Sequence, residues 1–264
     1  MPYMTRDGVK LFYEEAGVGE PPILFVHGWS CDHTYFAPQF GHFSIDHRVV
    51  AVDLRGHGQS DKPEQDYTLG ALADDLAWLC GELGLRKPVV IGHSMGGQLA
   101  VELGARHPEL PAALVLLEAP IVVPPDRRAL AEQLVPALRS PGYREVQRGF
   151  VEGALFAPTD DPLRKARIVE AMCSAPQHVL ASAYEQMFTW NGAAAAQACR
   201  VPVLNLSTAT TLNDNAGLTE LCPQVVHGQT VGAGHFHQLE VPDQVNAMID
   251  RFLTVGVPRP TASP

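Results

Sequence analysis

Positive charge is scarce in this chain of 264 residues, where 19 Lys and Arg residues face 29 Asp and Glu residues and leave a net charge of −10. Nucleic-acid binding depends on a basic surface patch, so this balance argues against a polyanionic partner. Long apolar runs are also lacking: each is interrupted within about ten residues, whereas a membrane-spanning helix needs roughly 18–20. Residues 1–10 mix charges and contain no apolar stretch typical of a secretory signal. We therefore expect neither nucleic acid nor a membrane as a partner.

Cysteine is sparse and follows no recognisable pattern. The number of cysteines is odd, and no two are spaced as Cys-x-x-Cys, so neither a disulfide framework nor a zinc ribbon is expected. Without a secretory signal, the expected state is reduced thiols in a cytoplasm. The 22 prolines and 23 glycines are spread along the chain, and neither a linker nor an internal repeat is visible. The five cysteines are Cys31, Cys80, Cys173, Cys199 and Cys222.

What the chain does have is a series of short apolar runs bounded by glycine or proline. Such runs are typical of strands that are buried on both faces of a parallel sheet. Between them lie helical patterns, such as the leucine repeat that follows Thr68, an expected N-cap. Strands that alternate with helices predict an α/β fold with a parallel sheet. The expected strands are 9–15, 23–26, 49–52, 89–91, 114–117, 201–206 and 225–231, and the expected helices among them are 68–83, 96–107 and 242–253.

One interval breaks this alternation. From Ala119 to Arg200 no convincing strand occurs, and four helices are expected instead, which is more than a crossover between two strands needs. We interpret the interval as a helical cap, residues 120–199, inserted into a core domain made of residues 1–119 and 200–264. The four expected cap helices are 126–139, 143–156, 162–173 and 176–190.

The segment Gly92-His93-Ser94-Met95-Gly96 has the Gly-x-Ser-x-Gly pattern of a nucleophile elbow. The pattern requires a strand to turn into a helix within a few residues, with glycines on either side of the serine to relieve crowding. An apolar strand precedes the segment and a helix follows it, which is the context that the pattern needs. Ser94 is therefore the candidate nucleophile, placed at a helix N-terminus that favours developing negative charge.

A serine nucleophile needs a base and an oxyanion hole. The candidate base is His235, on a glycine-rich loop between the last strand and the last helix, from which it could take the proton of Ser94. One oxyanion donor should be the amide of Met95, directly after the nucleophile. The second should be the amide of Trp29, because Gly28 allows the preceding strand to turn sharply there. Two such donors would contribute several kcal/mol to transition-state stabilisation.

Four motifs together resemble the α/β-hydrolase superfamily: His27-Gly28-Trp29, the segment 53–60, Gly92 to Gly97, and Gly232-Ala233-Gly234-His235. The resemblance covers roughly residues 8–118 and 200–254. It implies an α/β-hydrolase fold with a mostly parallel, eight-stranded sheet flanked by helices and carrying an inserted helical cap. It also implies a Ser–His–acid triad, a small-molecule acyl substrate, no cofactor, and a monomer or homodimer.

The acid departs from the usual pattern of the superfamily. Most members carry an Asp after the strand expected at 201–206, but here the equivalent position falls near Thr211, which cannot serve. Asp214 lies close by, on a loop that could bring it in. The rival is Glu118, which ends the strand after the nucleophile helix, as in some haloalkane dehalogenases and cofactor-free dioxygenases. Because a carboxylate there is costly to bury without a partner, we expect Glu118 to be the acid, with Asp214 as the alternative.

Other polar motifs have plainer explanations. Asp53 and His57 suggest a metal or acid–base site, but in this family context we expect the segment 53–60 to form a structural turn in which Arg55 pairs with a carboxylate or carbonyl, and no metal site is predicted. Cys31 lies near the oxyanion loop, yet the elbow carries a serine, which disfavours a cysteine nucleophile. Asp32 and its neighbour His33 are expected in a surface turn or at the pocket wall.

Apolar cap residues and the scarcity of clustered Lys or Arg favour a small, largely apolar substrate. The cap residues expected to face the cleft are Tyr184, Met187, Phe188 and Trp190. The leading hypothesis is a serine hydrolase, of the carboxylic ester hydrolase type, that cleaves an ester or lactone through an acyl-serine intermediate. The alternatives are a C–C bond hydrolase or cofactor-free dioxygenase acting on an aromatic or heteroaromatic compound, and a catalytically silent, ligand-binding member of the fold.

Overall fold

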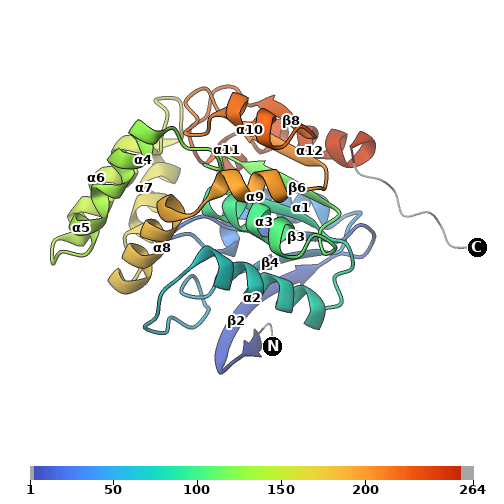
Figure 1. Ribbon diagram of the computed structural model, residues 1–264, viewed down its shortest axis with the longest axis horizontal. Coiled ribbons are helices and arrows are strands. Elements are labelled where there is room, and N and C mark those ends of the chain that lie inside the picture. The colour runs from blue at the N-terminus through green and yellow to red at the C-terminus, as the bar shows by residue number, and fades with distance from the viewer. Residues whose placement is uncertain (1–2, 257–264) are drawn as a thin grey trace, which may run out of the picture.

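A computed structural model describes residues 3–256; residues 1–2 and 257–264, which the expected core segments include, lie outside the described residues. Eight strands form one sheet in the order β1-β2-β4-β3-β5-β6-β7-β8 (Figure 1). Strand β2 runs antiparallel to both of its neighbours, and all later pairs are parallel. The α/β-hydrolase fold with a mostly parallel sheet is thereby confirmed. The strands are β1 (Tyr3–Arg6), β2 (Val9–Ala16), β3 (Ile23–Val26), β4 (Val49–Val52), β5 (Val89–His93), β6 (Ala113–Leu117), β7 (Val203–Ser207) and β8 (Val225–Gln229).

The central strands are buried on both faces, which explains their continuous apolar sequences. Successive side chains of a strand point to opposite faces, so β3 divides between two cores. Leu24 and Val26 pack on one side with the leucines of the helix after Thr68. Ile23 and Phe25 pack on the other side with the C-terminal helix. The alternation of side chains along β3 therefore determines which helices pack against each face of the sheet.

Helices cover both faces of the sheet. One face carries α2 and α3, and the other carries α1 and α12. Thr68 caps the first of these helices by accepting a hydrogen bond from the Ala71 amide, as its sequence predicts. In the part of the chain that the structure describes, no helix is long and apolar enough to cross a membrane. The elements are the 3₁₀ helix η1 (His33–Phe36), α1 (Ala37–Phe43), α2 (Leu69–Glu82), α3 (Met95–Arg106), α10 (Asn215–Leu221), α11 (His237–Glu240) and α12 (Pro242–Val255).

Six helices lie between β6 and β7, whereas the sequence predicts four. The expected helix 126–139 is split near Gln133, because Pro136 has no amide hydrogen and its ring would clash with the carbonyl of Glu132. The additional helix α9 contacts α3 on the flank of the sheet. We call α4–α8 the cap helices; they gather at one side of the sheet in Figure 1. The six are α4 (Pro125–Glu132), α5 (Leu134–Leu138), α6 (Tyr143–Ala154), α7 (Pro162–Met172), α8 (Gln177–Thr189) and α9 (Gly192–Ala198).

Candidate active site

Ser94 occupies the one-residue turn between β5 and α3. Its backbone has φ 54° and ψ −118°, a conformation that L-residues rarely adopt. Its amide donates to the Leu117 carbonyl at 2.8 Å, which ties the turn to β6. A Cβ atom at Gly92 would overlap the Gly96 carbonyl, and one at Gly96 would overlap the Val26 carbonyl. The two glycines of the motif are therefore required by close backbone contacts, as the elbow pattern predicts.

His235 is held by its own main chain. Its amide donates to the Leu155 carbonyl at 3.0 Å, and its carbonyl lies 2.9 Å from Nε2 of His93. The rings of His93 and His235 also lie close, with centroids 4.7 Å apart. Ser94 and His235 line the same small cavity, of about 30 Å³. The structure thus brings the expected base to the expected nucleophile.

Glu118 directly follows β6 and reaches the other side of the imidazole. Its Oε2 lies 3.6 Å from Nδ1 of His235, and its Oε1 accepts a hydrogen bond from the Thr208 amide at 2.6 Å. Burial alone would raise the pKa of Glu118, but its interactions with His235 and the Thr208 amide outweigh burial and lower the pKa. The carboxylate is therefore charged at neutral pH and can hold the histidine in one orientation.

Asp214, the alternative acid, performs a different task. Its Oδ1 accepts a hydrogen bond from the Gly217 amide at 3.0 Å and so caps α10. The side chain is exposed, and its own amide donates to the Val122 carbonyl at 2.7 Å. The structure does not bring Asp214 to His235. The loop after β7 instead supplies only the amide of Thr208 to the candidate triad.

The two expected oxyanion donors flank Ser94. Met95 is the first residue of α3, where a backbone amide has no acceptor within the helix. Within residues 3–256 the Trp29 amide donates no hydrogen bond, so it is free to meet a substrate oxygen. A Cβ atom at Gly28 would lie 3.1 Å from the Cβ of Ser94, so the loop packs directly against the nucleophile. Both amides are therefore available beside the candidate nucleophile.

The Trp29 side chain links the core to the cap. Its Nε1 donates to the Leu180 carbonyl of α8 at 2.9 Å, and its ring centroid lies 5.2 Å from that of Tyr184. Tyr184, Met187 and Phe188 of α8 all line the small cavity, as expected. The expectation fails for Trp190, which lines neither this cavity nor the larger one beside it.

Trp190 instead faces the flank of the sheet. Its Nε1 donates to Oε2 of Glu102 on α3 at 2.8 Å. The physical reason is that α8 ends at Thr189, and Trp190 has φ −63° and ψ 142°, an extended conformation. Its side chain therefore does not continue the helical face that carries the other three residues, and helical spacing gives no guide to its direction.

Two residues that the sequence did not single out position the histidine loop. His93 lies inside the elbow motif, and burial holds its pKa well below the usual range, so it stays neutral while it binds the His235 carbonyl. Asp160, from the cap segment between α6 and α7, accepts from the Gly234 amide at 2.9 Å and from the Ala157 amide at 2.8 Å. Of these two residues, only His93 carries a signal in the sequence, because it lies between Gly92 and Ser94 of the elbow motif.

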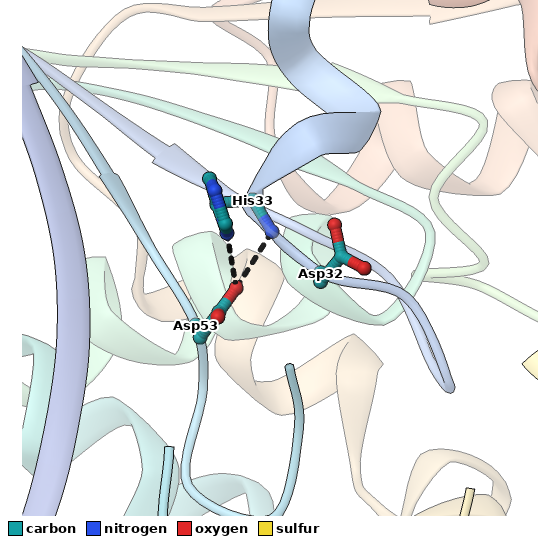
Figure 2. Close-up of side chains that lie close together, drawn as sticks. All are labelled: Asp32, His33 and Asp53. Carbon is teal, nitrogen blue, oxygen red and sulfur yellow. Dashed lines mark hydrogen bonds and ion pairs between the residues drawn. The ribbon is translucent and has the colours of Figure 1, made fainter. Parts of the chain in front are cut away.

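Asp53 forms a structural turn, as expected. Its Oδ1 accepts from the His33 amide at 2.7 Å and lies 2.8 Å from His33 Nδ1, while its Oδ2 accepts from the Gln59 amide at 2.7 Å. Asp32 accepts from Thr34 and caps η1. Figure 2 shows Asp32 beside the two contacts that join His33 to Asp53. Ligand atoms of Asp32, His33 and Asp53 lie within 4.8 Å of one another. The oxygens of Asp53 are nevertheless engaged by protein donors, which explains the cluster as a support for the loop.

Arg55 and Cys31 complete the neighbourhood of this turn. Arg55 binds Asp75 of α2 through Nε, 2.8 Å from Oδ2, which is the carboxylate pairing that the sequence suggests. Burial raises the pKa of the Cys31 thiol well above its usual range, and the nearby Asp32 charge adds to this effect. A neutral, buried thiol is a poor nucleophile, which leaves Ser94 as the candidate.

Comparison with known proteins yields the same fold. A family model described as alpha/beta hydrolase fold matches residues 21–161, more than half of the chain. The AB hydrolase superfamily protein YisY of Bacillus subtilis (strain 168) is 40% identical over 104 residues, which are 39% of this chain and 38% of that protein. The match thus covers well under two thirds of this curated relative.

Two solved structures align with nearly the whole chain. A thermophilic esterase from Thermogutta terrifontis has a TM-score of 0.84 and 26% identity, and the alignment covers 97% of this chain and 98% of that one. The enol-lactonase from Burkholderia xenovorans LB400 has a TM-score of 0.85 and 25% identity, with 96% and 100% covered. With its sheet order, its nucleophile elbow and the matching family model, the chain belongs to the α/β-hydrolase fold family.

Proposed function

We propose that this protein is a serine hydrolase that cleaves small, largely apolar carboxylic esters or lactones through an acyl-serine intermediate. The observation that carries the proposal is the convergence of three side chains from three loops. Ser94 and His235 line one cavity, and the carboxylate of Glu118 lies 3.6 Å from the far nitrogen of the same imidazole. This is the order nucleophile, base and orienting acid that acyl transfer requires.

The reaction follows from these positions. The Oγ atom of Ser94 attacks the ester carbonyl while His235 takes its proton, and Glu118 stabilises the imidazolium that forms. The amides of Trp29 and Met95 bind the oxyanion of the tetrahedral intermediate. When the intermediate collapses, His235 gives the proton to the leaving alcohol. Water, activated by the same histidine, then releases the acid from Ser94.

The similar solved structures support this choice of substrate class. One is an esterase and the other an enol-lactonase, and both align with almost all of this chain. The small cavity is lined mainly by apolar side chains, which include Tyr184, Met187 and Phe188 of α8. An apolar wall suits an uncharged ester, because it offers no partner for a charged group and charge is costly to bury alone.

A fluorophosphonate probe tests the nucleophile directly. We expect the probe to modify Ser94, as located by mass spectrometry, and p-nitrophenyl acetate to be hydrolysed. Ser94→Ala should abolish both labelling and turnover, with a loss of about 10⁶-fold in kcat. Ser44→Ala is the matched control, because Ser44 lies at the end of α1, where its hydroxyl donates to the Gly41 carbonyl of the same helix. Turnover that survives in the Ser94→Ala protein would refute the proposal.

A second candidate function is cofactor-free dioxygenation of a heteroaromatic compound, with cleavage of a C–C bond as a related reaction. The observation that favours it is the acid itself: Glu118 follows β6, the position that the resemblance associates with some cofactor-free dioxygenases. Oxygen uptake, measured with an electrode in the absence of ester turnover, would support this candidate. Ligand binding without either reaction would instead support a catalytically silent member of the fold.

A further inference from the structure

Two cavities of very different size meet at His235. The smaller, about 30 Å³, is lined by Ser94 and by the oxyanion loop residue Trp29. The larger, about 760 Å³, is lined by His235 and Glu118 but by neither Ser94 nor Trp29. The catalytic groups are thus arranged asymmetrically, with the nucleophile facing the narrow space and the base bordering both.

The chemistry of the acyl-serine route assigns a part of the substrate to each space. The carbonyl carbon becomes bonded to Ser94 while its oxygen faces the Trp29 amide, so the acyl group lies in the small cavity. The leaving oxygen must take its proton from His235, so the alcohol part lies on the side of the imidazole. That side opens into the large cavity. The smaller space therefore receives the acyl group, and the larger receives the leaving alcohol.

The volumes set the size of each part. One water-sized probe needs about 10–15 Å³, so the small cavity holds only two or three such groups, about the size of an acetyl or propionyl chain. Met172 and Met187, which are both buried, line it. The large cavity is within the range of roughly 300–1,000 Å³ that binds drug-sized molecules. A short acyl group and a bulky alcohol fit this pair of spaces.

The walls of the large cavity indicate the chemical character of the alcohol. Leu134, Val146 and Phe156 give it an apolar lining from three cap segments. Arg127 on α4 and Glu145 on α6 also line it, but both are exposed and their charges are opposite. These two charges cancel, and the third charged group of the wall, Glu118, is engaged by His235 and the Thr208 amide, so the wall offers no free charge that would select an anion or a cation. An uncharged, apolar alcohol is the best match.

We propose that the site selects esters with a short acyl group and a bulky apolar alcohol, and discriminates against the reverse arrangement. The proposal rests on the serine hydrolase function given above and adds the direction in which the substrate is bound. Met187, a buried residue that lines the small cavity, is then a specificity-determining residue for the acyl group. Leu134, a half-buried residue that lines the large cavity, is the corresponding specificity-determining residue for the alcohol.

Isomeric esters provide the sharpest test. Hexyl acetate and ethyl hexanoate have the same atoms and nearly the same hydrophobicity, but the long chain lies on the alcohol side in one and on the acyl side in the other. In a pH-stat assay we expect kcat/KM to be at least about tenfold higher for hexyl acetate, the effect of excluding a few methylene groups from a pocket. Equal values, or a preference for ethyl hexanoate, would overturn the proposal.

Two variants should move the preference in a defined way. Met187→Ala enlarges the small cavity and should raise kcat/KM for ethyl hexanoate several-fold. Leu134→Trp fills the large cavity and should lower kcat/KM for hexyl acetate more than for ethyl hexanoate, whose alcohol part is only an ethyl group. Met248→Ala on α12 is the matched methionine control, outside both cavities, and should keep the wild-type preference. If Leu134→Trp affected both isomers equally, the assignment of the alcohol side would be wrong.

The outcome for p-nitrophenyl acetate separates the two proposals. If its hydrolysis depends on Ser94 but ethyl hexanoate is the better isomer, the serine hydrolase function stands and the binding direction is refuted. If no ester is hydrolysed in a Ser94-dependent manner, the function itself fails and the direction fails with it.

Discussion

The core side and the cap side of the site are built by different means. On the core side, Ser94 and Glu118 both have positive φ, and both donate their amides to the neighbouring strand. On the cap side, α8 contributes apolar side chains, and α4 borders the large cavity without a single buried residue. Main-chain bonds of the sheet therefore fix Ser94 and Glu118, while the cap determines the shape of the space around them and holds the His235 loop through Leu155 and Asp160. Substitutions should accordingly change rate on one side and selectivity on the other.

After the loss of the nucleophile itself, the largest expected effect is at the acid. Glu118→Gln keeps the size of the side chain but removes the charge that orients His235 and stabilises the imidazolium. We expect kcat for p-nitrophenyl acetate to fall by about 10³–10⁴-fold, with KM little changed. Asp214→Asn, the matched carboxylate-to-amide change after β7, should leave kcat near the wild-type value. The reverse result for the two variants would show that the acid is Asp214, in the loop after β7, and not Glu118.

The next largest effect is expected in the oxyanion loop, where Gly28 has no side chain and can therefore pack closely against Ser94. In Gly28→Ala the new Cβ would lie 3.1 Å from both His93 Nδ1 and the Cβ of Ser94, so the loop must shift and carry the Trp29 amide with it. We expect kcat to fall by about tenfold, because a displacement of about 1 Å can cost a hundredfold and this contact requires a smaller one. Gly41→Ala in α1 meets nothing within 4 Å and is the control. An unchanged kcat in Gly28→Ala would contradict the assignment of the Trp29 amide as a donor of the oxyanion hole.

The carboxylate of Glu118, on the core side, should also affect how the free energy of unfolding depends on pH. Burial opposes ionisation of Glu118, yet the interactions with His235 and Thr208 hold its pKa below the ordinary value of 4.5. A lowered folded-state pKa gives a contribution to stability that is complete above the unfolded pKa and is lost as the pH falls through the folded pKa. On acidification from neutral pH, the free energy of unfolding should therefore decrease more for the wild type than for Glu118→Gln. Urea titrations across the acid range measure this difference, and parallel curves would contradict it.

The smallest expected effect on activity is at the edge of the cap. Trp190→Phe removes the indole N–H that binds Glu102, and Trp190 lines neither cavity. We expect the free energy of unfolding to fall by about 1 kcal/mol, the value of one hydrogen bond, with kcat/KM for both hexyl acetate and ethyl hexanoate unchanged. Denaturant titration and the pH-stat assay measure the two quantities. A change in the preference between the isomers would show that Trp190 does line the substrate pocket.

The sequence predicts the core side of the site better than the cap side, for a physical reason. At Gly92 and Gly96 a side chain would overlap a carbonyl oxygen, so the elbow requires a pattern that is visible in the sequence itself. A carboxylate such as Glu118 at the end of an apolar strand also stands out, because it needs a partner in order to be buried. Each of these constraints is local to a few residues.

On the cap side the decisive features are not local. The direction of Trp190 depends on where α8 ends, and Asp160 binds Gly234, which lies 74 residues further along the chain. The split of the expected helix 126–139 could have been inferred from Pro136, whose ring opposes helix continuation. Edge strand β1 is missed because four half-exposed residues leave little apolar pattern. Tertiary contacts, rather than periodicity, determine these parts.

The position of the acid has a consequence for how the protein can change. Because Glu118 follows β6, the loop after β7 contributes only the backbone amide of Thr208, which every residue except proline can supply. Asn213 then anchors the far end of that loop by accepting hydrogen bonds from the Ile121 and Val122 amides. Residues 209–212 lie between these two fixed points, and Thr210 and Leu212 line the large cavity. This short stretch can be randomised in directed evolution to alter the pocket without disturbing the catalytic carboxylate.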